Sequence, residues 1–427
     1  MKSILIWIAM GSLLATFAEA QQASYTVIDL GALKNGPFSM ANGESLNGIV
    51  NGVSGRPDGT QHAVLWYRGS VIDLALPGLG GPNSAAFGVN AVGLASGLTE
   101  TSAPDPHGED FCGFGTFRRC LPFLWYGGIM YPLPTLGGNN GEAGEINNRG
   151  EVAGNTENIK LDATCPIGGP QRFQEKPVLW KNRQVIELPT YPSDPDGWAF
   201  GINDSGQIAG ASGICSPLNP ETGVYILSRH ALLWDNEKPI DLGNLGGTGA
   251  FGPGNVALEV NNQGEVVGSS DLASDTTFHA FLWTRTAGIQ DLGTLKGDFA
   301  SAGLAINDGG NIVGASFDAD FNPRAFLWRK GVMTDLNTLI PANSLFVSLL
   351  FAHGVNSRGE IVGFGVTNGG DVHGFLAVPK DARESLESSE PDIRHRTGPV
   401  VAPEAARKWL FRLLRTPEFG PGSVRKP

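Results

Sequence analysis

Short apolar runs separated by turn-forming residues recur along nearly the whole chain. A representative run is His279–Trp283, whose bulky apolar composition is typical of a strand buried between two layers. A representative turn is Asn203–Gly206, because Asn suits the first position of a type I turn and Gly suits the last, where φ is often positive. The apolar positions show no 3.6-residue period in these segments. The pattern therefore predicts many short strands joined by tight hairpins.

Three landmarks recur in a fixed order and define seven repeats. Each repeat has an Asn-x-x-Gly turn, a second Gly four residues later, and then a strand that ends at Trp. The turn positions are Ser45, Asn90, Asn147, Asn203, Asn261, Asn307 and Asn356. The strand ends are Trp66, Trp125, Trp180, Trp234, Trp283, Trp328 and Ala377. Successive turn positions lie 45 to 58 residues apart, a period that suits a propeller blade of about four strands.

A small residue stands four positions before every turn position. These residues are Ala41, Ala86, Ala143, Ala199, Ala257, Gly303 and Ala352. Seven small side chains at one repeat position imply a crowded place. We expect this position on the innermost strand, near the axis of a ring.

The third landmark is an Asp-Leu-like strand, and its distribution predicts how the ends of the array meet. Its six copies after the Trp strands are Asp73-Leu74, Pro132-Leu133, Glu187-Leu188, Asp241-Leu242, Asp291-Leu292 and Asp335-Leu336. The last repeat lacks a copy, whereas a seventh stands alone at Tyr25–Leu33. Because ring closure removes free strand edges, we expect an all-β, seven-bladed β-propeller over residues 21–381, closed by the N-terminal strand. An open β-solenoid is the alternative, but it would not need this permutation.

These repeats resemble the HAF-repeat family of extracellular proteins. The resemblance rests on His279–Trp283, on the segment Ile202–Gly210 and on Asp291–Leu295, and it covers about residues 25–379. The departures from the pattern are Ser45, Pro132 and Ala377. The resemblance implies a repeat architecture and export, and it transfers no catalytic residues to this chain.

Both ends of the chain differ from the repeats. Residues 1–20 predict a secretory signal peptide, with Lys2 before an apolar stretch and the small-x-small pattern Ala18–Ala20; an uncleaved anchor is the alternative. Residues 382–427 predict a disordered linker with an amphipathic helix over 404–415. That helix suits contact with an anionic membrane surface or a partner, or else frays in solution. We expect a secreted protein, extracellular or periplasmic.

Charge and motifs narrow the class of function. The formal net charge is −12, and phosphate binding needs a basic face, so nucleic acid is not expected as a partner. The sequence contains no Gly-x-Ser-x-Gly, phosphate-loop or His-Glu-x-x-His motif. We expect no cofactor, no metal and no catalytic residues, and a monomer that binds an extracellular ligand such as a glycan or a protein.

Three adjacent repeats carry insertions between their second and third predicted strands. The turn position lies 35, 33 and 31 residues before the Trp in repeats two, three and four, against 21 or 22 residues in the others. All four cysteines lie in these insertions, and we expect the disulfides Cys112–Cys120 and Cys165–Cys215, the second joining adjacent blades. The insertions emerge on the face of the blade-to-blade crossings. They predict a prepared binding surface, although long loops also need bracing.

Acidic side chains at two places are the candidate binding residues. The insertion of repeat two holds Asp105, His107, Glu109 and Asp110. These groups suit cation binding or acid–base chemistry, but their spacing matches no ligand pattern, and solvated loop charge is the simpler interpretation. Glu145 and Glu259 stand two positions before their turns, where other repeats have small residues. They are candidates to hold a cation in the channel, and an ion pair or hydrogen bond between blades is the simpler interpretation.

Four histidines share one repeat position: His62, His230, His279 and His373. Because they belong to different blades, we expect a repeated structural hydrogen bond rather than one metal site. The sequence thus predicts a secreted propeller that acts as a binding or interaction module through the long loops of blades two to four. The alternative is a secreted hydrolase or lyase acting on a polysaccharide through carboxylates on that face.

Overall fold

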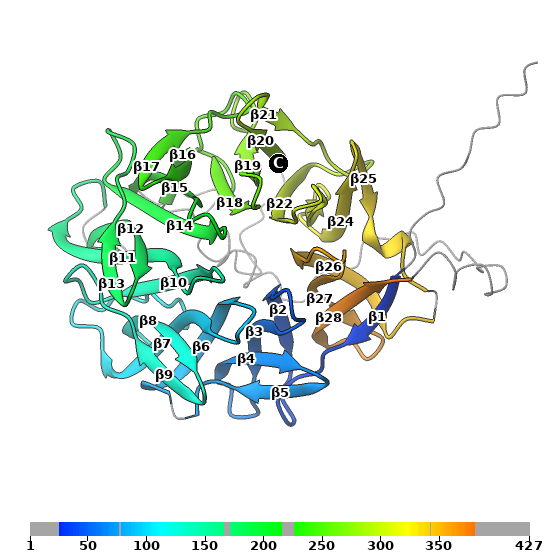
Figure 1. Cartoon of the computed structure of the whole chain (residues 1–427), viewed down its shortest axis with the longest axis horizontal. Coiled ribbons are helices and arrows are strands. Elements are labelled where there is room, and N and C mark those ends of the chain that lie inside the picture. The colour runs from blue at the N-terminus through cyan, green and yellow to red at the C-terminus, as the bar shows by residue number, and fades with distance from the viewer. Residues whose placement is uncertain (1–24, 77, 166–170, 216–225, 342, 381–427) are drawn as a thin grey trace, which may run out of the picture.

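The computed structural model describes residues 25–76, 78–165, 171–215, 226–341 and 343–380. The predicted signal peptide and the predicted linker and helix of the C-terminal region lie outside these residues. The described chain forms seven four-stranded antiparallel sheets around a central axis, so the predicted all-β seven-bladed propeller is confirmed (Figure 1). No helix in the described ranges is long and apolar enough to cross a membrane.

Each of the first six blades is a meander whose first strand lies nearest the axis (Figure 1). Blade 1 contains β2 (Ser39–Glu44), β3 (Val50–Gly55), β4 (Gln61–Tyr67) and β5 (Ser70–Asp73). Blade 2 contains β6 (Gly80–Val89), β7 (Ala95–Pro104), β8 (Arg118–Tyr126) and β9 (Ile129–Pro132). Blade 3 contains β10 (Gly141–Ile146), β11 (Val152–Leu161), β12 (Phe173–Lys181) and β13 (Gln184–Glu187).

The remaining meanders complete the ring. Blade 4 contains β14 (Asp196–Ile202), β15 (Ile208–Cys215), β16 (Ile226–Asp235) and β17 (Lys238–Asp241). Blade 5 contains β18 (Val256–Val260), β19 (Val266–Asp271), β20 (Phe278–Thr284) and β21 (Gly288–Asp291). Blade 6 contains β22 (Ala300–Ile306), β23 (Ile312–Phe317), β24 (Pro323–Arg329) and β25 (Val332–Asp335), followed by the 3-10 turn η1 (Leu336–Thr338).

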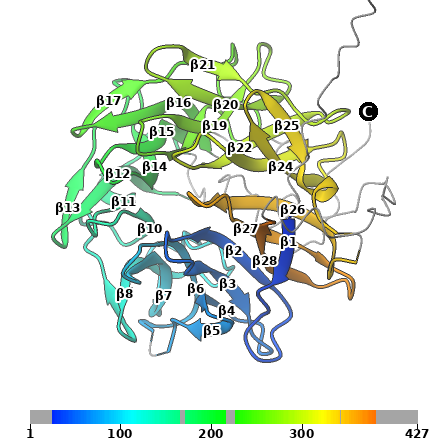
Figure 2. The ribbon, with the colours of Figure 1, turned by 45° about the vertical axis from the view of Figure 1, so that its right-hand side comes forward.

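Blade 7 is built from both ends of the described chain. It contains β26 (Phe346–Val355), β27 (Ile361–Thr367) and β28 (Val372–Pro379), and its fourth strand is β1 (Tyr25–Asp29). β1 runs antiparallel beside β28 with Asp29 opposite Phe375 (Figure 2). His373 Nδ1 lies 2.9 Å from the Asp29 carboxylate. The closure predicted from the permuted repeat is confirmed, and it is made by strand pairing within one blade.

A β-bulge interrupts every inner strand directly after its small residue. In β2 the pairing register shifts between Ala41 and Gly43, and a shift at the same repeat position occurs in each of the seven blades. The second repeat Gly lies opposite the small residue, where a Cβ on Gly52 would overlap the carbonyl oxygen of Met40. The equivalent overlaps occur at Gly97, Gly154, Gly210, Gly268, Gly314 and Gly363. The repeated Gly is therefore needed for close approach of the first two strands.

The shared histidine position forms the expected structural hydrogen bond. Third and fourth strands are joined by the pairs His62–Asp73, His279–Asp291 and His373–Asp29, with distances from Nδ1 to the carboxylate of 2.8 to 2.9 Å. In blade 4, His230 instead contacts Asp194 at 2.7 Å. Blade 2 has Leu121 at the histidine position and Pro132 at the aspartate position. Both partners of this hydrogen bond are therefore replaced in that blade.

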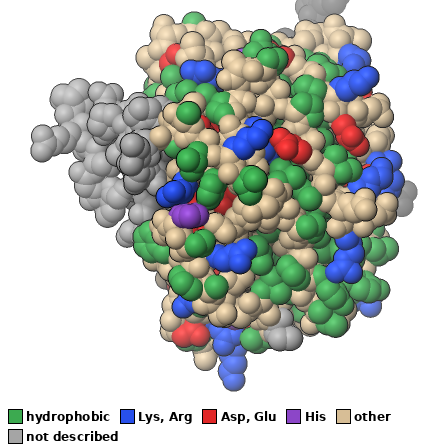
Figure 3. All heavy atoms as spheres, turned by 90° about the vertical axis from the view of Figure 1, so that its left-hand side faces the viewer, with side chains coloured by type: hydrophobic (Ala, Val, Ile, Leu, Met, Phe, Trp, Pro, Cys, Tyr) green, Lys and Arg blue, Asp and Glu red, His purple; other side chains and the backbone are tan. Residues whose placement is uncertain are grey.

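The outer wall of the ring mixes side chains of different types. On the side of blades 3 and 4, acidic, basic and apolar side chains are interspersed, without a patch of one charge sign (Figure 3). The two ends of the ring differ more strongly from one another. One end carries the Asn-x-x-Gly turns, and the other carries the insertions and the crossings between blades. These two ends hold the candidate sites.

Candidate functional site

A ring of asparagine amides joins the turns at one end of the propeller. Asn90 Oδ1 accepts hydrogen bonds from Val92 N and Leu94 N at 3.2 and 3.0 Å within its own turn. Its Nδ2 donates to the carbonyl oxygen of Asn147 in the next blade at 3.1 Å. Equivalent bonds of 2.8 to 3.1 Å link Asn147 to Asn203, Asn203 to Asn261, Asn261 to Asn307 and Asn307 to Asn356. The sequence predicted the turns but not this ring, which needs a side chain that both accepts and donates.

Blade 1 has Ser45 at the turn position and closes the amide ring by other means. Asn356 Nδ2 donates to the Glu44 carboxylate at 3.2 Å, and Asn47 Nδ2 donates to the carbonyl oxygen of Ala91 at 2.8 Å. Burial and the neighbouring Glu360 charge raise the pKa of Glu44 well above its usual range. Glu44 is thus a further carboxyl group at this end, which the repeat analysis missed because most repeats have Ile or Val there.

A cavity of about 200 Å³ opens among these turns and continues into the central channel. All seven blades contribute to its wall, which includes Glu145 of β10 and Glu259 of β18. The two carboxyl groups form a hydrogen bond with each other. Burial raises the pKa of Glu145, and burial together with the charge of Glu145 raises the pKa of Glu259 well above its usual range. The pair therefore shares a proton, and the expected hydrogen bond between blades is observed.

Gly201 of β14 lies beside this channel pair, on the blade between its two members. A Cβ on Gly201 would stand 2.7 Å from Glu259 Oε1 and 2.8 Å from the carbonyl oxygen of Leu258. Real Cβ atoms do not approach other atoms so closely. The absence of a side chain at this position allows Glu145 and Glu259 to meet.

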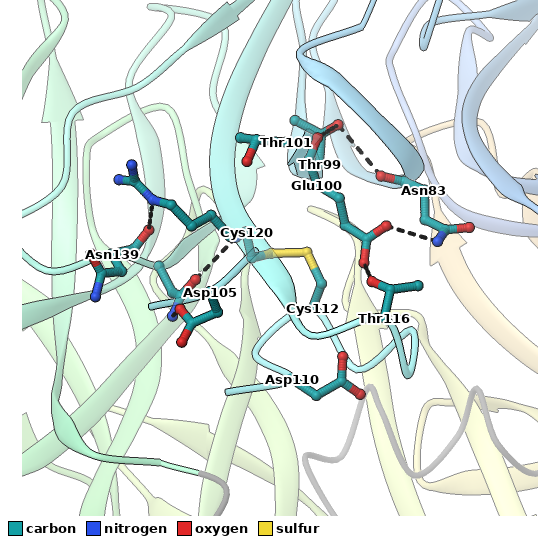
Figure 4. The surroundings of a disulfide bond; sticks show 12 residues. Asn83, Thr99, Glu100, Thr101, Asp105, Asp110, Cys112, Thr116, Cys120 and Asn139 are labelled. Atoms are coloured by element: carbon teal, nitrogen blue, oxygen red, sulfur yellow. Dashed lines mark hydrogen bonds between the residues drawn. A yellow bond between two sulfur atoms is a disulfide. The ribbon is translucent and has the colours of Figure 1, made fainter. Parts of the chain in front are cut away.

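The insertion of blade 2 and the described parts of the blade 3 insertion lie at the opposite end of the ring, whereas residues 216–225, the predicted loop of blade 4, lie outside the described residues. Cys112–Cys120 closes the blade 2 loop, and Cys165–Cys215 joins blade 3 to blade 4, as the sequence predicted. Figure 4 shows the first disulfide beside Glu100, whose carboxylate accepts hydrogen bonds from Asn83 Nδ2 and Thr116 Oγ1. The loop is therefore bound to the body of its own blade as well as closed on itself.

Asp105 organises the blade 2 loop from inside. Its Oδ1 accepts hydrogen bonds from His107 N and Glu109 N at 2.7 and 3.0 Å, as in an Asx turn. Its Oδ2 accepts a hydrogen bond from Asn140 Nδ2 at 3.0 Å, and Asn140 belongs to the crossing between blades 2 and 3. One carboxylate thus fixes the fold of the loop and its position on the next blade.

Glu109 and Glu157 form a second carboxyl pair, between blades 2 and 3. Glu109 Oε1 accepts a hydrogen bond from Arg172 N at 2.6 Å, and its carboxyl group also hydrogen-bonds to Glu157. Burial and then the Asp105 charge raise the pKa of Glu109 to about 7. Burial and then the Glu109 charge raise the pKa of Glu157 to about 9. Because both side chains are at most 4% exposed, this pair retains its proton near neutral pH and joins the blade 2 loop to β11 of blade 3.

The expectation of solvated loop charge is wrong for Asp105 and Glu109, which are both buried. Each accepts one hydrogen bond from beyond its own loop, Asp105 from Asn140 and Glu109 from Arg172, and the sequence could not show that those donors would be near. His107 is exposed, with its ring edge-on to Phe173 at 5.1 Å, and Asp110 accepts a hydrogen bond from Gly115 N at 2.8 Å. Of the six candidate residues, four lie in the blade 2 loop and two, Glu145 and Glu259, lie on the wall of the channel.

Two carboxyl groups at the loop end were missed by the sequence reasoning. Glu157 and Asp196 are fully buried. Asp196 begins a strand with small and apolar residues after it, a signal that could have identified it, whereas Glu157 lies between the polar residues Thr156 and Asn158 and has no such signal. Asp196 Oδ2 accepts a hydrogen bond from Cys215 N at 3.2 Å, beside the second disulfide. Burial and then Asp162 raise the pKa of Asp196 well above its usual range. Within the described part of the chain, no three His, Cys, Asp or Glu side chains are arranged to hold a metal ion.

Comparison with known proteins finds similarity only among solved structures, at low sequence identity. No family model and no curated protein matches the chain. Among solved structures, the chain is similar to the β-propeller domain of the Trilobed protease from Pyrococcus furiosus, with 10% identity and a TM-score of 0.47 over 81% of this chain and 98% of that one. It is also similar to the WD40 β-propeller domain of Doa1, with 13% identity and a TM-score of 0.38 over 83% and 93% of the two chains. AofleA from Arthrobotrys oligospora is similar at 10% identity and a TM-score of 0.36 over 73% and 88%.

Proposed function

We propose that this protein is an extracellular binding module that contacts its ligand through the insertions of blades 2, 3 and 4. The observation that carries the proposal is that the blade 2 insertion, the described parts of the blade 3 insertion and the end of β15 in blade 4 are joined by disulfides and hydrogen bonds, whereas the other blades have short turns at the same place. Two disulfides and the Asp105 and Glu109 contacts hold these segments together. A loop that is already ordered loses little conformational entropy when it binds, which favours affinity.

The insertions also present apolar side chains to solvent. Phe117 of the blade 2 loop is 54% exposed, and Ile159 and Leu161 at the end of β11 are 74% and 63% exposed. Exposed aromatic and aliphatic groups on a rigid support are typical of surfaces that anchor a partner. A protein surface or the apolar face of a sugar ring suits these groups.

Export and family membership are part of the same proposal. The chain has the three landmarks of the HAF-repeat family in the order typical of that family, which supports membership. Two disulfides are typical of an oxidising compartment, which supports secretion or periplasmic export. A binding module on the outside of a cell agrees with both.

A polysaccharide hydrolase or lyase is the alternative function. Such an enzyme needs carboxyl groups that reach the glycosidic bond. Asp105, Glu109 and Glu157 are buried beneath the loops and occupied with hydrogen bonds that hold the loops together. The binding function is therefore the better supported of the two. Release of reducing sugar from a polysaccharide panel, abolished by Asp110→Asn or Glu145→Gln, would favour the enzyme.

The test compares binding by the full chain and by two variants on panels of immobilised glycans and immobilised extracellular-matrix proteins. In the first variant, Phe117→Ser and Ile159→Ser remove two exposed apolar groups. In the second, residues 102–117 are replaced by the five-residue connection 56–60 of blade 1. We expect the full chain to bind one class of ligand, the first variant to bind at least tenfold more weakly, and the second not to bind.

The matched control changes exposed residues at the other end of the ring. Val92→Ser and Gln263→Ala lie on the turns outside the cavity wall and should leave ligand binding unchanged. Far-ultraviolet circular dichroism and thermal denaturation establish that each variant is folded. Equal binding by the full chain and the loop variants, or no binding on either panel, would reject the proposed function.

A further inference from the structure

The cavity among the turns is lined by acids and by no base. Its acidic side chains are Glu44, Glu145, Asp204, Glu259 and Asp308, and none of the described lining residues is Lys or Arg. The other titratable group of the wall is His353, whose pKa burial lowers to about 3, so it is neutral at physiological pH. With acidic side chains, a neutral His353 and no Lys or Arg among the described lining residues, the wall favours a cation over an anion.

One wall of the cavity has hydrogen-bond acceptors without donors. Asn51 is 1% exposed, and its Nδ2 donates to the carbonyl oxygen of Ala86 at 3.2 Å, as does Asn42 Nδ2 at 2.8 Å. Of the lining residues, Asn51 Oδ1 and Glu44 Oε1 are enclosed and accept no hydrogen bond from any described residue. A buried acceptor without a donor costs about 1–3 kcal/mol. A ligand that brings N–H groups into the cavity would satisfy these atoms.

The acid pair lies on one side of the channel. At the repeat position of Glu145 and Glu259, the other blades have Gly43, Gly88, Gly201, Ala305 and Gly354. A Cβ on Gly88 or Gly354 would meet packed neighbours at 2.6 to 2.9 Å, so close packing of the blades requires the small residues, and only blades 3 and 5 place a carboxyl group here. The cavity of about 200 Å³ is too large for a bare ion and smaller than the roughly 300–1,000 Å³ of ordinary ligand pockets.

We propose that this channel site binds a small organic cation with several N–H donors, an alkylammonium or an alkylguanidinium group. Its charge would face Glu145 and Glu259, and its N–H groups would reach acceptors such as Asn51 Oδ1. A metal ion suits the site less well, since in the described chain no three acidic or histidine side chains converge on one point. The site is independent of the loop face and adds a second ligand to the proposed function.

Two kinds of molecule can supply such a cation. A free amine can enter the cavity from solvent, or a partner protein can insert a Lys or Arg side chain between the turns. Asp204 and Asp308 at the mouth, with the amides of Asn148 and Asn262 hydrogen-bonded to them, would be the first contact in either case.

The test titrates the full chain with n-butylammonium chloride, n-butylguanidinium chloride and the neutral n-butanol, using calorimetry and ligand-observed NMR. We expect saturable binding of both cations at one site per chain and none of n-butanol. The double variant E145Q/E259Q keeps the shape of the pair and removes its charge, and it should bind the cations at least tenfold more weakly. The matched control Glu157→Gln changes the buried pair at the loop end and should bind them as the wild type does.

A second variant tests the proposal without changing the Glu145–Glu259 pair, in case E145Q/E259Q does not fold. Asp204→Asn with Asp308→Asn removes two charges at the mouth, keeps one of the two accepting oxygens of each side chain, and should weaken cation binding two- to fivefold. The capped peptide acetyl-Gly-Lys-Gly-amide then distinguishes the sources: binding at least as tight as that of n-butylammonium indicates a partner side chain, and weaker binding indicates a free amine. Cations that bind no better than n-butanol, or with unchanged affinity in E145Q/E259Q, would overturn the proposal.

Discussion

Two pairs of glutamic acids, one at each end of the ring, have the same chemistry and different surroundings. The pair Glu109–Glu157 is sealed between two loops, and backbone N–H groups of Arg172, Asn139 and Asn140 bind its outer oxygens. The pair Glu145–Glu259 lies on the wall of a cavity and remains partly accessible to the water inside it. Both pairs hold a shared proton because burial raises their pKa values.

The difference shows that what surrounds a buried acid pair decides its role. Where protein fills all the space, the proton is a structural element that joins two segments. Where a cavity remains, the proton can be exchanged for a cation that enters from solvent.

The largest effect is expected from the disulfide between blades 3 and 4. Changing Cys165 and Cys215 to Ser frees a segment of 50 residues and should lower the free energy of unfolding by about 4 kcal/mol, measured by chemical denaturation. The same change at Cys112 and Cys120, which are eight residues apart, should cost about 2.5 kcal/mol. The affinity for n-butylammonium should be unchanged in both. A change in that affinity would show that the two ends are coupled, against the comparison drawn above.

The next effect is a pH dependence that originates at the loop end. The folded-state pKa values of Glu109 and Glu157, about 7 and about 9, lie above the value of 4.5 for an unperturbed Glu. The stability that these groups contribute is therefore fully present below pH 4.5 and is lost as pH rises through 7 and 9. We expect the free energy of unfolding to fall by on the order of 2 kcal/mol between pH 5 and pH 9.

The variant Glu157→Gln identifies the origin of that pH dependence. It keeps a hydrogen bond to Glu109 without a titrating proton, so it should flatten the profile and be more stable than the wild type at pH 9. The control Glu187→Gln, at an exposed position, should keep the wild-type slope. Stability that rises between pH 5 and pH 9, or an unchanged slope in Glu157→Gln, contradicts this assignment.

The smallest effect is expected in the channel. Gly201→Ala places a methyl group against Glu259 and the carbonyl oxygen of Leu258 and should cost about 1–2 kcal/mol in thermal denaturation. It should also separate the carboxyl pair and weaken binding of n-butylammonium. The matched variant Gly43→Ala meets only the Asn51 side-chain amide, at 3.1 Å, and should cost less than about 0.5 kcal/mol. Equal losses of stability in the two variants would show that Gly201 is not needed for Glu145 and Glu259 to meet.

Much of the architecture could be predicted from the repeat. The Asn-x-x-Gly turn, the Trp strand and the displaced copy at Tyr25–Leu33 together predicted seven blades and their closure, because turn chemistry and strand periodicity are local properties. The disulfides were also predictable, since Cys165 and Cys215 lie in the insertions of consecutive repeats. Even the positive φ expected of the turn glycines is observed, as at Gly93 and Gly206.

The role of each acidic residue was decided only by the tertiary structure. Asp105 and Asp110 stand in the same loop, yet Asp105 is buried because Asn140 of the next crossing supplies a donor, while Asp110 only caps a local turn. Glu145 and Glu259 meet because Gly201 between them has no side chain. Repeat spacing records how each segment folds by itself, whereas a shared proton or an unpaired amide oxygen depends on which side chains come together when the ring closes.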